Sequence, residues 1–291
     1  MPFSPGSRRR TREPAVGEHL RETWRIEDAG GLILIRCEPL LEAPGVAHAF
    51  STRRADGRAE FDVGGVGAPD PEAAGRRARF LRAAGIAATC PAILKQVHGA
   101  RIVLARAEGE VQEADGGIWF RDGRSAAPSV RSADCVPILL VDREGKAAAA
   151  VHAGWRGTAA SIVVRAVEHL GGGGVSPGRI VAALGPAIRP CCYKVGRDVA
   201  EAVLAATGRN LESENHRAGG IRVDLQEANR AQLVLAGVPT DAIHAAPWCT
   251  GCRPDLFFSY RRDGAGAGRT MASVGPAVCR EAENPEETQP S

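Results

Sequence analysis

The chain has 291 residues, of which 44% are hydrophobic and 24% are charged. These fractions are close to globular averages, so they exclude a disordered, collagen-like or low-complexity chain for the bulk of the sequence and leave one large domain or two small ones. Lysine and arginine number 37 against 34 aspartates and glutamates, and the net charge of +3 is too small to indicate a nucleic-acid-binding protein.

Cysteine usage and hydropathy indicate the compartment. Eight cysteines in 291 residues are too few for a small disulfide-stapled secreted scaffold, so a reducing compartment is expected. The longest apolar run, from Cys135 to Val141, is far shorter than the roughly 20 residues that cross a bilayer. A signal peptide requires an apolar stretch after its basic residues, and no such stretch follows the N-terminal arginines. We therefore expect a cytoplasmic protein without a membrane segment.

In chain order, the sequence predicts a flexible tail, one domain and a second tail. Residues 1–28 are rich in arginine and punctuated by proline, and residues 279–291 are acidic, so both are expected to be tails around a single domain at 29–278. Apolar runs predict strands, and helical periodicity predicts helices. The predicted strands are 31–36, 91–95, 136–141, 147–151 and 179–184, and the predicted helices are 71–84, 157–170, 197–207 and 225–236.

The order of these elements indicates the fold class. Helices and strands alternate without a strict strand-helix-strand rhythm, which favours a single layered α/β domain with mixed sheets flanked by helices. Asp224 and Glu227 have the spacing of a capping box at the start of the last helix, and Gly237 is its expected stop.

Three short segments each carry a soft metal ligand at a predicted strand end. They contain His98, Cys135 and His152, and glycine or proline follows each ligand within two residues. One thiolate and two imidazoles suit Zn²⁺, and three protein ligands leave a fourth position open for water or substrate. Such an open zinc lowers the pKa of bound water to about 7. The alternative is two ordinary histidines and a small core cysteine, because separations of 37 and 17 residues match no local zinc-finger pattern.

The motifs around these residues resemble those of the YfiH family, which is also called the laccase-domain or multicopper polyphenol oxidoreductase family. The resemblance covers about three quarters of the chain, and it rests on AHAFSTR at 47–53, KQVHG at 95–99, ADC at 133–135, HAGWRG at 152–157, GPAIRPCCY at 185–193 and FFSYRRDG at 257–264. It implies a YfiH-like, cysteine-hydrolase-like α/β sandwich. It also implies that zinc binds at His98, Cys135 and His152.

The resemblance further implies an enzyme that acts on purine nucleosides. The expected reactions are phosphorolysis of adenosine, inosine, guanosine and methylthioadenosine to the base and ribose 1-phosphate, and hydrolytic deamination of adenosine. Deamination needs an acid/base group near the activated water, and Asp134 is one candidate. Asp134 has an equally plausible structural role, since strand alternation directs it to the other face, where it could cap a turn.

Phosphorolysis also needs cationic groups that orient a phosphate dianion. Arginine suits this role because its planar fork grips phosphate, and Arg156 follows the ligand His152 by four residues. Arg53 and Arg261 are further candidates on expected loops, and Tyr260 could stack on a purine. In a chain so rich in arginine, an ordinary solvated charge is the alternative for each of them.

Three other functions remain open at this stage. Seven histidines are too few for an oxidase with several histidine-bound coppers, but a single copper could occupy the zinc site and give laccase-like oxidation. Cys135 could instead be a thiolate nucleophile with His98 or His152 as its base, in an amidase or deamidase. The resemblance links this alternative to the editing of peptidoglycan precursors. A non-catalytic metabolite-binding module is the third alternative.

Four more cysteines form two short motifs. Cys249 and Cys252 have the spacing of a redox or zinc-clip motif, and Cys191 and Cys192 are adjacent. A single C-x-x-C without a second pair is a weak signal, and adjacent cysteines rarely bridge without strain. The sequence therefore predicts packing or incidental thiols at these positions.

Overall fold

The computed structural model describes residues 23–57, 60–64, 70–87, 92–106, 111–121, 126–207 and 220–278. Residues 1–22 and 279–291, which belong to the predicted tails, lie outside the described residues. The predicted N-terminal tail is wrong at its end, because Trp24–Ala29 forms strand β1 and pairs antiparallel with β2, Leu32–Cys37. Gly30 and Gly31, with φ of 64° and 83°, make the tight turn between them. Strand β1 contains no apolar run that would reveal it, and only Trp24 among its residues is buried.

The first six-stranded sheet has the order β1-β2-β3-β14-β7-β4. Its remaining strands are β3 (Val46–Ala55), β14 (Thr270–Pro276), β7 (Pro128–Ser132) and β4 (Ala92–Ile93). All neighbours are antiparallel except β4 and β7, which are parallel. The last strand of the described chain therefore lies in the middle of this sheet, between β3 and β7.

The second six-stranded sheet has the order β13-β10-β8-β9-β6-β5. These strands are β13 (Ile243–Ala245), β10 (Ile180–Leu184), β8 (Val136–Asp142), β9 (Ala147–Ala153), β6 (Gly116–Phe120) and β5 (Ile102–Leu104). The two edge pairs are parallel and the central pairs are antiparallel, so this sheet is also mixed. A separate short pair joins β11 (Lys194–Val195) to β12 (Ile221–Arg222).

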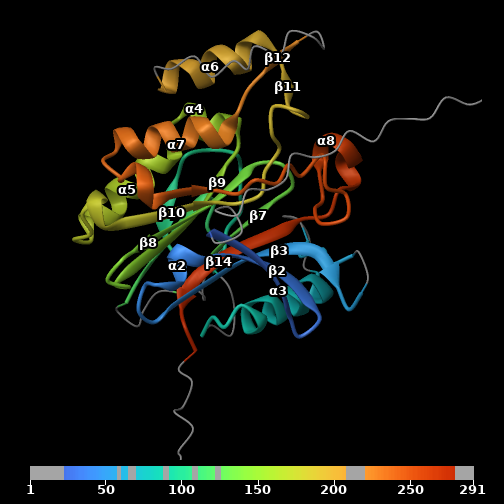
Figure 1. Ribbon diagram of the computed structural model, residues 1–291, viewed down its shortest axis with the longest axis vertical. Coiled ribbons are helices and arrows are strands. Elements are labelled where there is room, and N and C mark those ends of the chain that lie inside the picture. The colour runs from blue at the N-terminus through green and yellow to red at the C-terminus, as the bar shows by residue number, and fades with distance from the viewer. Residues whose placement is uncertain are drawn as a thin grey trace, which may run out of the picture.

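The two sheets pack face to face, and strand alternation shows how. Along β8, Leu139 and Val141 belong to the core between the sheets, whereas Ile138 and Leu140 belong to the core beneath the helices. Because neighbouring strand residues point to opposite faces, a strand that is apolar throughout is buried on both sides. Figure 1 shows the two sheets crossing in the middle of the molecule.

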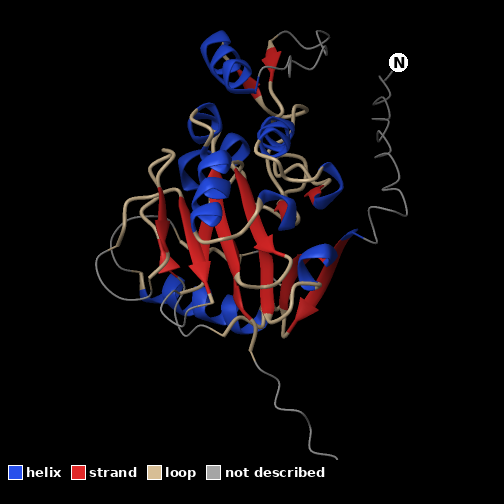
Figure 2. Ribbon diagram, turned by 90° about the vertical axis from the view of Figure 1, so that its left-hand side faces the viewer, coloured by secondary structure: helices blue, strands red, loops and turns tan. Residues whose placement is uncertain are grey.

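Helices cover both outer faces of this pair of sheets. Helix α3 (Pro71–Ala83) packs Phe80 and Leu81 against the first sheet, and α4 (Trp155–Ala159), α5 (Ile162–Gly172) and α7 (Leu225–Leu235) cover the second. Helix α6 (Arg197–Thr207) lies further out, against α4 and α7 (Figure 1). Figure 2 shows strands with helices above and below them. Two further short helices are α2 (Glu38–Leu41) and α8 (Tyr260–Asp263). The predicted layered α/β fold is confirmed.

The predicted helix 157–170 is wrong in one respect, because the structure divides it into α4 and α5. Ser161 adopts a left-handed φ of 55° between them, and no proline or glycine at that point signals the break. The helices predicted at 71–84, 197–207 and 225–236 are confirmed to within a residue. Among the described residues, no helix is both long enough and apolar enough to cross a membrane.

Strand β9 is built largely from alanine. Residues 147–150 are all alanine and all completely buried, and His152 follows near the end of the strand. The small side chains let β9 pack closely against β6 and β8 on either side and against the layers above and below.

Phe80 provides a test of the packing between α3 and the first sheet. We expect Phe80→Ala to lower the free energy of unfolding by about 3–5 kcal/mol, because it empties a fully buried position between α3 and the first sheet. Chemical denaturation measures this change. Leu235→Ala is the control, because Leu235 is 71% exposed and should change stability by only about 0.5 kcal/mol. Equal effects in the two variants would contradict the assigned packing.

Candidate functional site

The strand register brings two of the three predicted metal ligands together. In the antiparallel pair β8–β9, Pro137 lies opposite His152. Cys135 precedes β8 by one residue, so alternation puts it on the same face as His152, at the open end of the pair. His98 comes from the loop between β4 and β5, and its ring meets that of His152 edge-on at 4.9 Å between centroids. The ligand atoms of the three residues all lie within 4.8 Å of one another.

Asp115, which the sequence analysis missed, organises this set. It is completely buried, and its Oδ1 lies 2.8 Å from His152 Nδ1. The same carboxylate accepts the backbone N–H groups of Val97, His98 and Gly99 at 3.2, 3.0 and 2.7 Å. Asp115 thus holds the histidine loop in place. It also directs Nε2 of His152 toward Cys135, as a carboxylate behind a ligating histidine does.

The electrostatics of this group favour a thiolate at Cys135 paired with a charged imidazole at His152. Burial raises the pKa of Cys135, but the positive charge of His152 and hydrogen bonds from both histidines outweigh it and lower the pKa to about 6. Burial also opposes the charged form of His152 and so lowers its pKa, but the Cys135 thiolate and Asp115 outweigh burial and raise the pKa to about 9. Burial also opposes ionisation of Asp115, yet His152 and the loop N–H groups hold its pKa below the usual value. The thiolate is therefore formed readily, and the thiolate is the form of cysteine that binds metal.

Gly154 lets the main chain approach two of the ligands closely. A Cβ atom at this position would lie 3.0 Å from Cys135 Sγ and 3.2 Å from His98 Cδ2. Any side chain here would push the two ligands apart. The donor set, its orientation by Asp115 and the close approach at Gly154 together fit a metal with three protein ligands. No further cysteine, histidine or carboxylate joins this set within the described part of the chain.

The three ligands open into a cavity of about 590 Å³. Gln96, Ile188 and Leu225 contribute to its wall, as do three aromatic residues, Trp155, Tyr193 and Tyr260. The cavity also contains the arginines Arg131, Arg156, Arg261 and Arg269, whereas Asp134 is its one lining carboxylate among the described residues. This excess of positive charge suits an anionic ligand.

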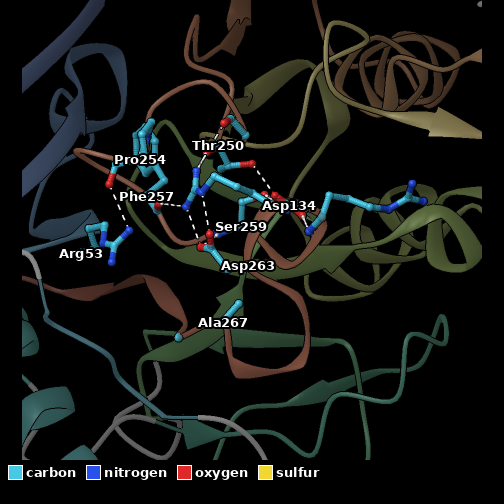
Figure 3. A network of polar contacts seen from close by, with 12 residues as sticks. Arg53, Asp134, Thr250, Pro254, Phe257, Ser259, Asp263 and Ala267 are labelled. Atoms are coloured by element: carbon cyan, nitrogen blue, oxygen red, sulfur yellow. Dashed lines mark hydrogen bonds and ion pairs between the residues drawn. The ribbon is translucent and has the colours of Figure 1, made fainter.

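The predicted phosphate ligands occupy different places. Arg156 is exposed in the first turn of α4, its guanidinium stacks 4.4 Å from the Trp155 ring, and no described residue pairs with it. Arg261 donates to Lys194 O at 2.7 Å and lies 4.8 Å from the Tyr193 ring. Arg53 is not on the expected loop but in strand β3. Its guanidinium donates to Pro254 O at 3.0 Å (Figure 3). It also stacks on the ring of Phe258 and is not among the residues that line the cavity.

Asp134 is held on both of its oxygens. Oδ1 accepts the Thr250 hydroxyl at 2.6 Å, and Oδ2 accepts the Arg261 backbone N–H at 2.7 Å (Figure 3). Its backbone has a φ of 94°, which is rare for a residue other than glycine and needs such anchoring. These contacts account for Asp134 as the residue that fixes the loop carrying Cys135.

The remaining cavity residues gave little sequence signal. Arg131 is 6% exposed, and burial together with the charges of Arg77 and Arg269 lowers its pKa. Arg131 is one of many arginines in the chain, and the sequence of its strand, Pro128–Ser132, does not distinguish it. The acidic residue of Ala114-Asp115-Gly116-Gly117, just before a strand, is the one signal that could have found Asp115.

Comparison with known proteins decides the family. Residues 47–277 match the family described as multi-copper polyphenol oxidoreductase laccase. The chain belongs to this family. Proteins named YfiH are among its similar relatives, in agreement with the resemblance found in the sequence. The family name refers to copper, but the three-ligand set described above does not by itself identify the metal.

The similar proteins are named for reactions on purine nucleosides. A purine nucleoside phosphorylase of Deinococcus radiodurans is 41% identical over 246 residues, which cover 81% of this chain and 92% of that protein. Adenosine deaminase RL5, from an unknown prokaryotic organism, is 42% identical over 50% of this chain and 56% of its own. The crystal structure of YlmD from Geobacillus stearothermophilus has a TM-score of 0.75 and 30% identity, and covers 86% of this chain and 98% of that one.

The role of Asp115 can be tested by removing its charge. We expect Asp115→Asn to weaken metal binding by about 10- to 100-fold, because the carboxylate that orients His152 is lost. Competition with a chromophoric chelator measures the affinity. Glu113→Gln is the matched control, because Glu113 is half exposed and pairs with the equally exposed Lys95. Unchanged affinity in Asp115→Asn would contradict the assigned role.

Gly154 gives a second test of the site. Gly154→Ala should lower metal content per chain, since the added methyl group lies between Cys135 and His98. In Gly171→Ala nothing lies within 4 Å of the added Cβ, so metal content should not change. Elemental analysis of the two variants compares them directly. Full metal content in Gly154→Ala would show that the space beside Cys135 is not needed.

Proposed function

We propose that this protein is a zinc-dependent purine nucleoside phosphorylase that also deaminates adenosine. The proposed substrates are adenosine, inosine, guanosine and methylthioadenosine, which phosphate cleaves to the base and ribose 1-phosphate. One observation carries the proposal: a single cavity joins the set His98, Cys135 and His152 to several arginines. The names of the similar proteins support the same reaction class.

The arginines supply what phosphorolysis requires. A phosphate dianion must be held beside the ribose, and Arg156, with its unpaired guanidinium among the described residues, is the group best placed to bind it. Arg261 and Arg269 add positive charge on the cavity wall, and the positive field stabilises charge that develops as the glycosidic bond breaks. Tyr260, half exposed at the rim, offers a face for the purine.

Zinc would be held by His98, Cys135 and His152, and it would supply a Lewis acid to the cavity. The protein's own contribution is to orient these ligands through Asp115 and Asp134. Asp134 enters the proposal as a positioning residue, because both of its oxygens already accept hydrogen bonds. The substrates are small molecules, and we place the enzyme in the reducing cytoplasm, where the Cys135 thiol stays available for metal.

A second candidate is a cysteine hydrolase of the amidase or deamidase class, as in the editing of peptidoglycan precursors. The observation that favours it is the series Cys135, His152 and Asp115, which has the order of nucleophile, base and orienting carboxylate. This candidate requires Cys135 without metal. A copper ion at the same three ligands would be an alternative occupant, and laccase-like oxidation would then follow the metal supplied.

Product analysis with and without phosphate tests the proposed function. Purified protein incubated with inosine should release hypoxanthine only when phosphate is present, and incubated with adenosine it should also form inosine. Chromatography identifies the products, and elemental analysis of the same sample identifies the metal. A metal-free protein that is alkylated at Cys135 only during turnover of an amide would favour the hydrolase instead.

Cys135→Ala should abolish both metal binding at this site and turnover, because it removes the thiolate ligand and leaves two histidines. Cys37→Ala is the matched control, since Cys37 is buried in the core between the sheets and does not belong to the three-ligand set. Steady-state rates of inosine phosphorolysis compare the two variants. Full activity in Cys135→Ala would refute the proposal.

Arg156→Ala should reduce phosphorolysis more than deamination, because only phosphorolysis binds phosphate. We expect a loss of about 10²-fold or more in phosphorolysis kcat/KM, comparable to removing one group that stabilises transition-state charge. Arg165→Ala, an exposed arginine of α5 that donates to Ala160 O, is the control. Equal losses in both reactions would mean that Arg156 has a structural role.

A further inference from the structure

A second group of four cysteines meets outside the cavity. Cys191 and Cys192 follow β10, Cys249 and Cys252 follow β13, and their Sγ atoms all lie within 4.8 Å of one another. The sequence predicts packing or incidental thiols here, and the structure adds that the two motifs meet and that Cys191 and Cys252 are exposed. The two motifs meet because β10 and β13 are parallel neighbours, so the segments that leave them run side by side. Ala187 and Cys249 continue that pairing as a bridge.

The sulfur separations match a shared metal better than a disulfide. Cys252 Sγ lies 3.5 Å from Cys191 Sγ and 3.4 Å from Cys192 Sγ. A disulfide requires about 2.05 Å. Four thiolates at about 2.3 Å from a tetrahedral Zn²⁺ are separated from one another by roughly 3.8 Å. The cluster thus needs only small sulfur movements to surround one ion.

Hydrogen bonds that involve the main chain hold both loops in place. Thr250 N–H donates to Ala187 O at 3.0 Å and ties the second loop to the first. The guanidinium of Arg222 donates to Pro190 O at 2.6 Å and to Cys191 O at 2.8 Å. Cys249 Sγ accepts the backbone N–H of Arg189 at 3.4 Å, a contact that stabilises a thiolate. The four sulfurs therefore converge on a framework that is already fixed.

Space and charge around the cluster also suit a metal. Gly251 lies between the two motif cysteines, and a Cβ there would come within 2.9 Å of Cys192 Cβ and Sγ. Four thiolates around Zn²⁺ carry a net charge of about −2. The guanidinium of Arg222, beside Cys191, and that of Arg262, which donates to Thr250 O and Gly251 O, lie where they offset this charge.

We propose that Cys191, Cys192, Cys249 and Cys252 form a closed, structural four-thiolate zinc site. Soft thiolates in tetrahedral arrangement select zinc, and four protein ligands leave no open position for chemistry. Each thiol loses its proton to solvent as the ion binds. The bound zinc joins the loop that carries Tyr193, a cavity wall residue, to the loop that carries Thr250, the anchor of Asp134. This site is separate from the three-ligand site, and it does not depend on the proposed function.

Zinc content in full-length variants tests the site. Cys135→Ala removes the thiolate of the three-ligand site, so zinc that remains reports the four-cysteine cluster. We expect Cys135→Ala purified with zinc and a thiol reductant to retain one equivalent of zinc, and Cys135→Ala/Cys252→Ser to lose it. Cys135→Ala/Cys37→Ala is the matched control and should retain it. A folded Cys135→Ala chain without zinc, or a Cys252 disulfide found by mass spectrometry in reductant-purified protein, would overturn the proposal.

Cobalt substitution gives a second measurement with no need for the Cys135 variant. In protein loaded with Co²⁺ alone, thiolate-to-cobalt absorption grows with the number of bound thiolates, and four of the five candidate thiolates belong to this cluster. We expect Cys252→Ser to lose most of that absorption and Cys37→Ala to lose none. Undiminished absorption in Cys252→Ser would overturn the proposal. This holds even if the variant contains less zinc because its fold is less stable.

Discussion

One buried carboxylate connects the parts of the candidate site. Asp115 accepts three successive N–H groups from the loop that carries His98, and it pairs with His152 on the neighbouring strand. His98 itself has a left-handed φ of 60°, a conformation that needs such support. The backbone of Asp115 also accepts the N–H of His152 at 2.7 Å. Asp115 therefore positions the loop that carries His98 and the ligand His152 on β9, through its side chain and its backbone carbonyl.

The sequence predicts the layered fold and the three ligands better than it predicts their support. Apolar runs such as Val136 to Val141 are visible because they are buried on both faces, and HAGWRG is visible as a motif. Strand β1 is hidden because only Trp24 among its residues is buried and it contains no apolar run, and Ser161 breaks a helix without any residue that signals a break. Asp115 and Arg131 act through contacts made only in the folded chain. One carboxylate or one arginine among many carries no local pattern.

The cavity and the four-cysteine cluster share structural connections. Thr250 lies between Cys249 and Cys252 and donates to Asp134, which precedes the ligand Cys135. Tyr193 follows Cys192 directly and lines the cavity. The same two loops thus serve the cluster on one side and the cavity on the other. Glycine occupies the closest approach in both places, Gly154 beside Cys135 and Gly251 beside Cys192, because a side chain would separate the sulfur from its neighbours.

The alanines of β9 have a consequence for how rigidly His152 is held. Alanine has no rotatable side-chain torsion to rearrange, so residues 147–150 cannot absorb a local change by adopting other rotamers. A larger residue at any of these positions has to shift the strand itself, and the shift would be transmitted along the backbone to the imidazole near its end. Residues 147–150 therefore tolerate little sequence variation although none of them is a ligand, and their intolerance arises from mechanics rather than from chemistry.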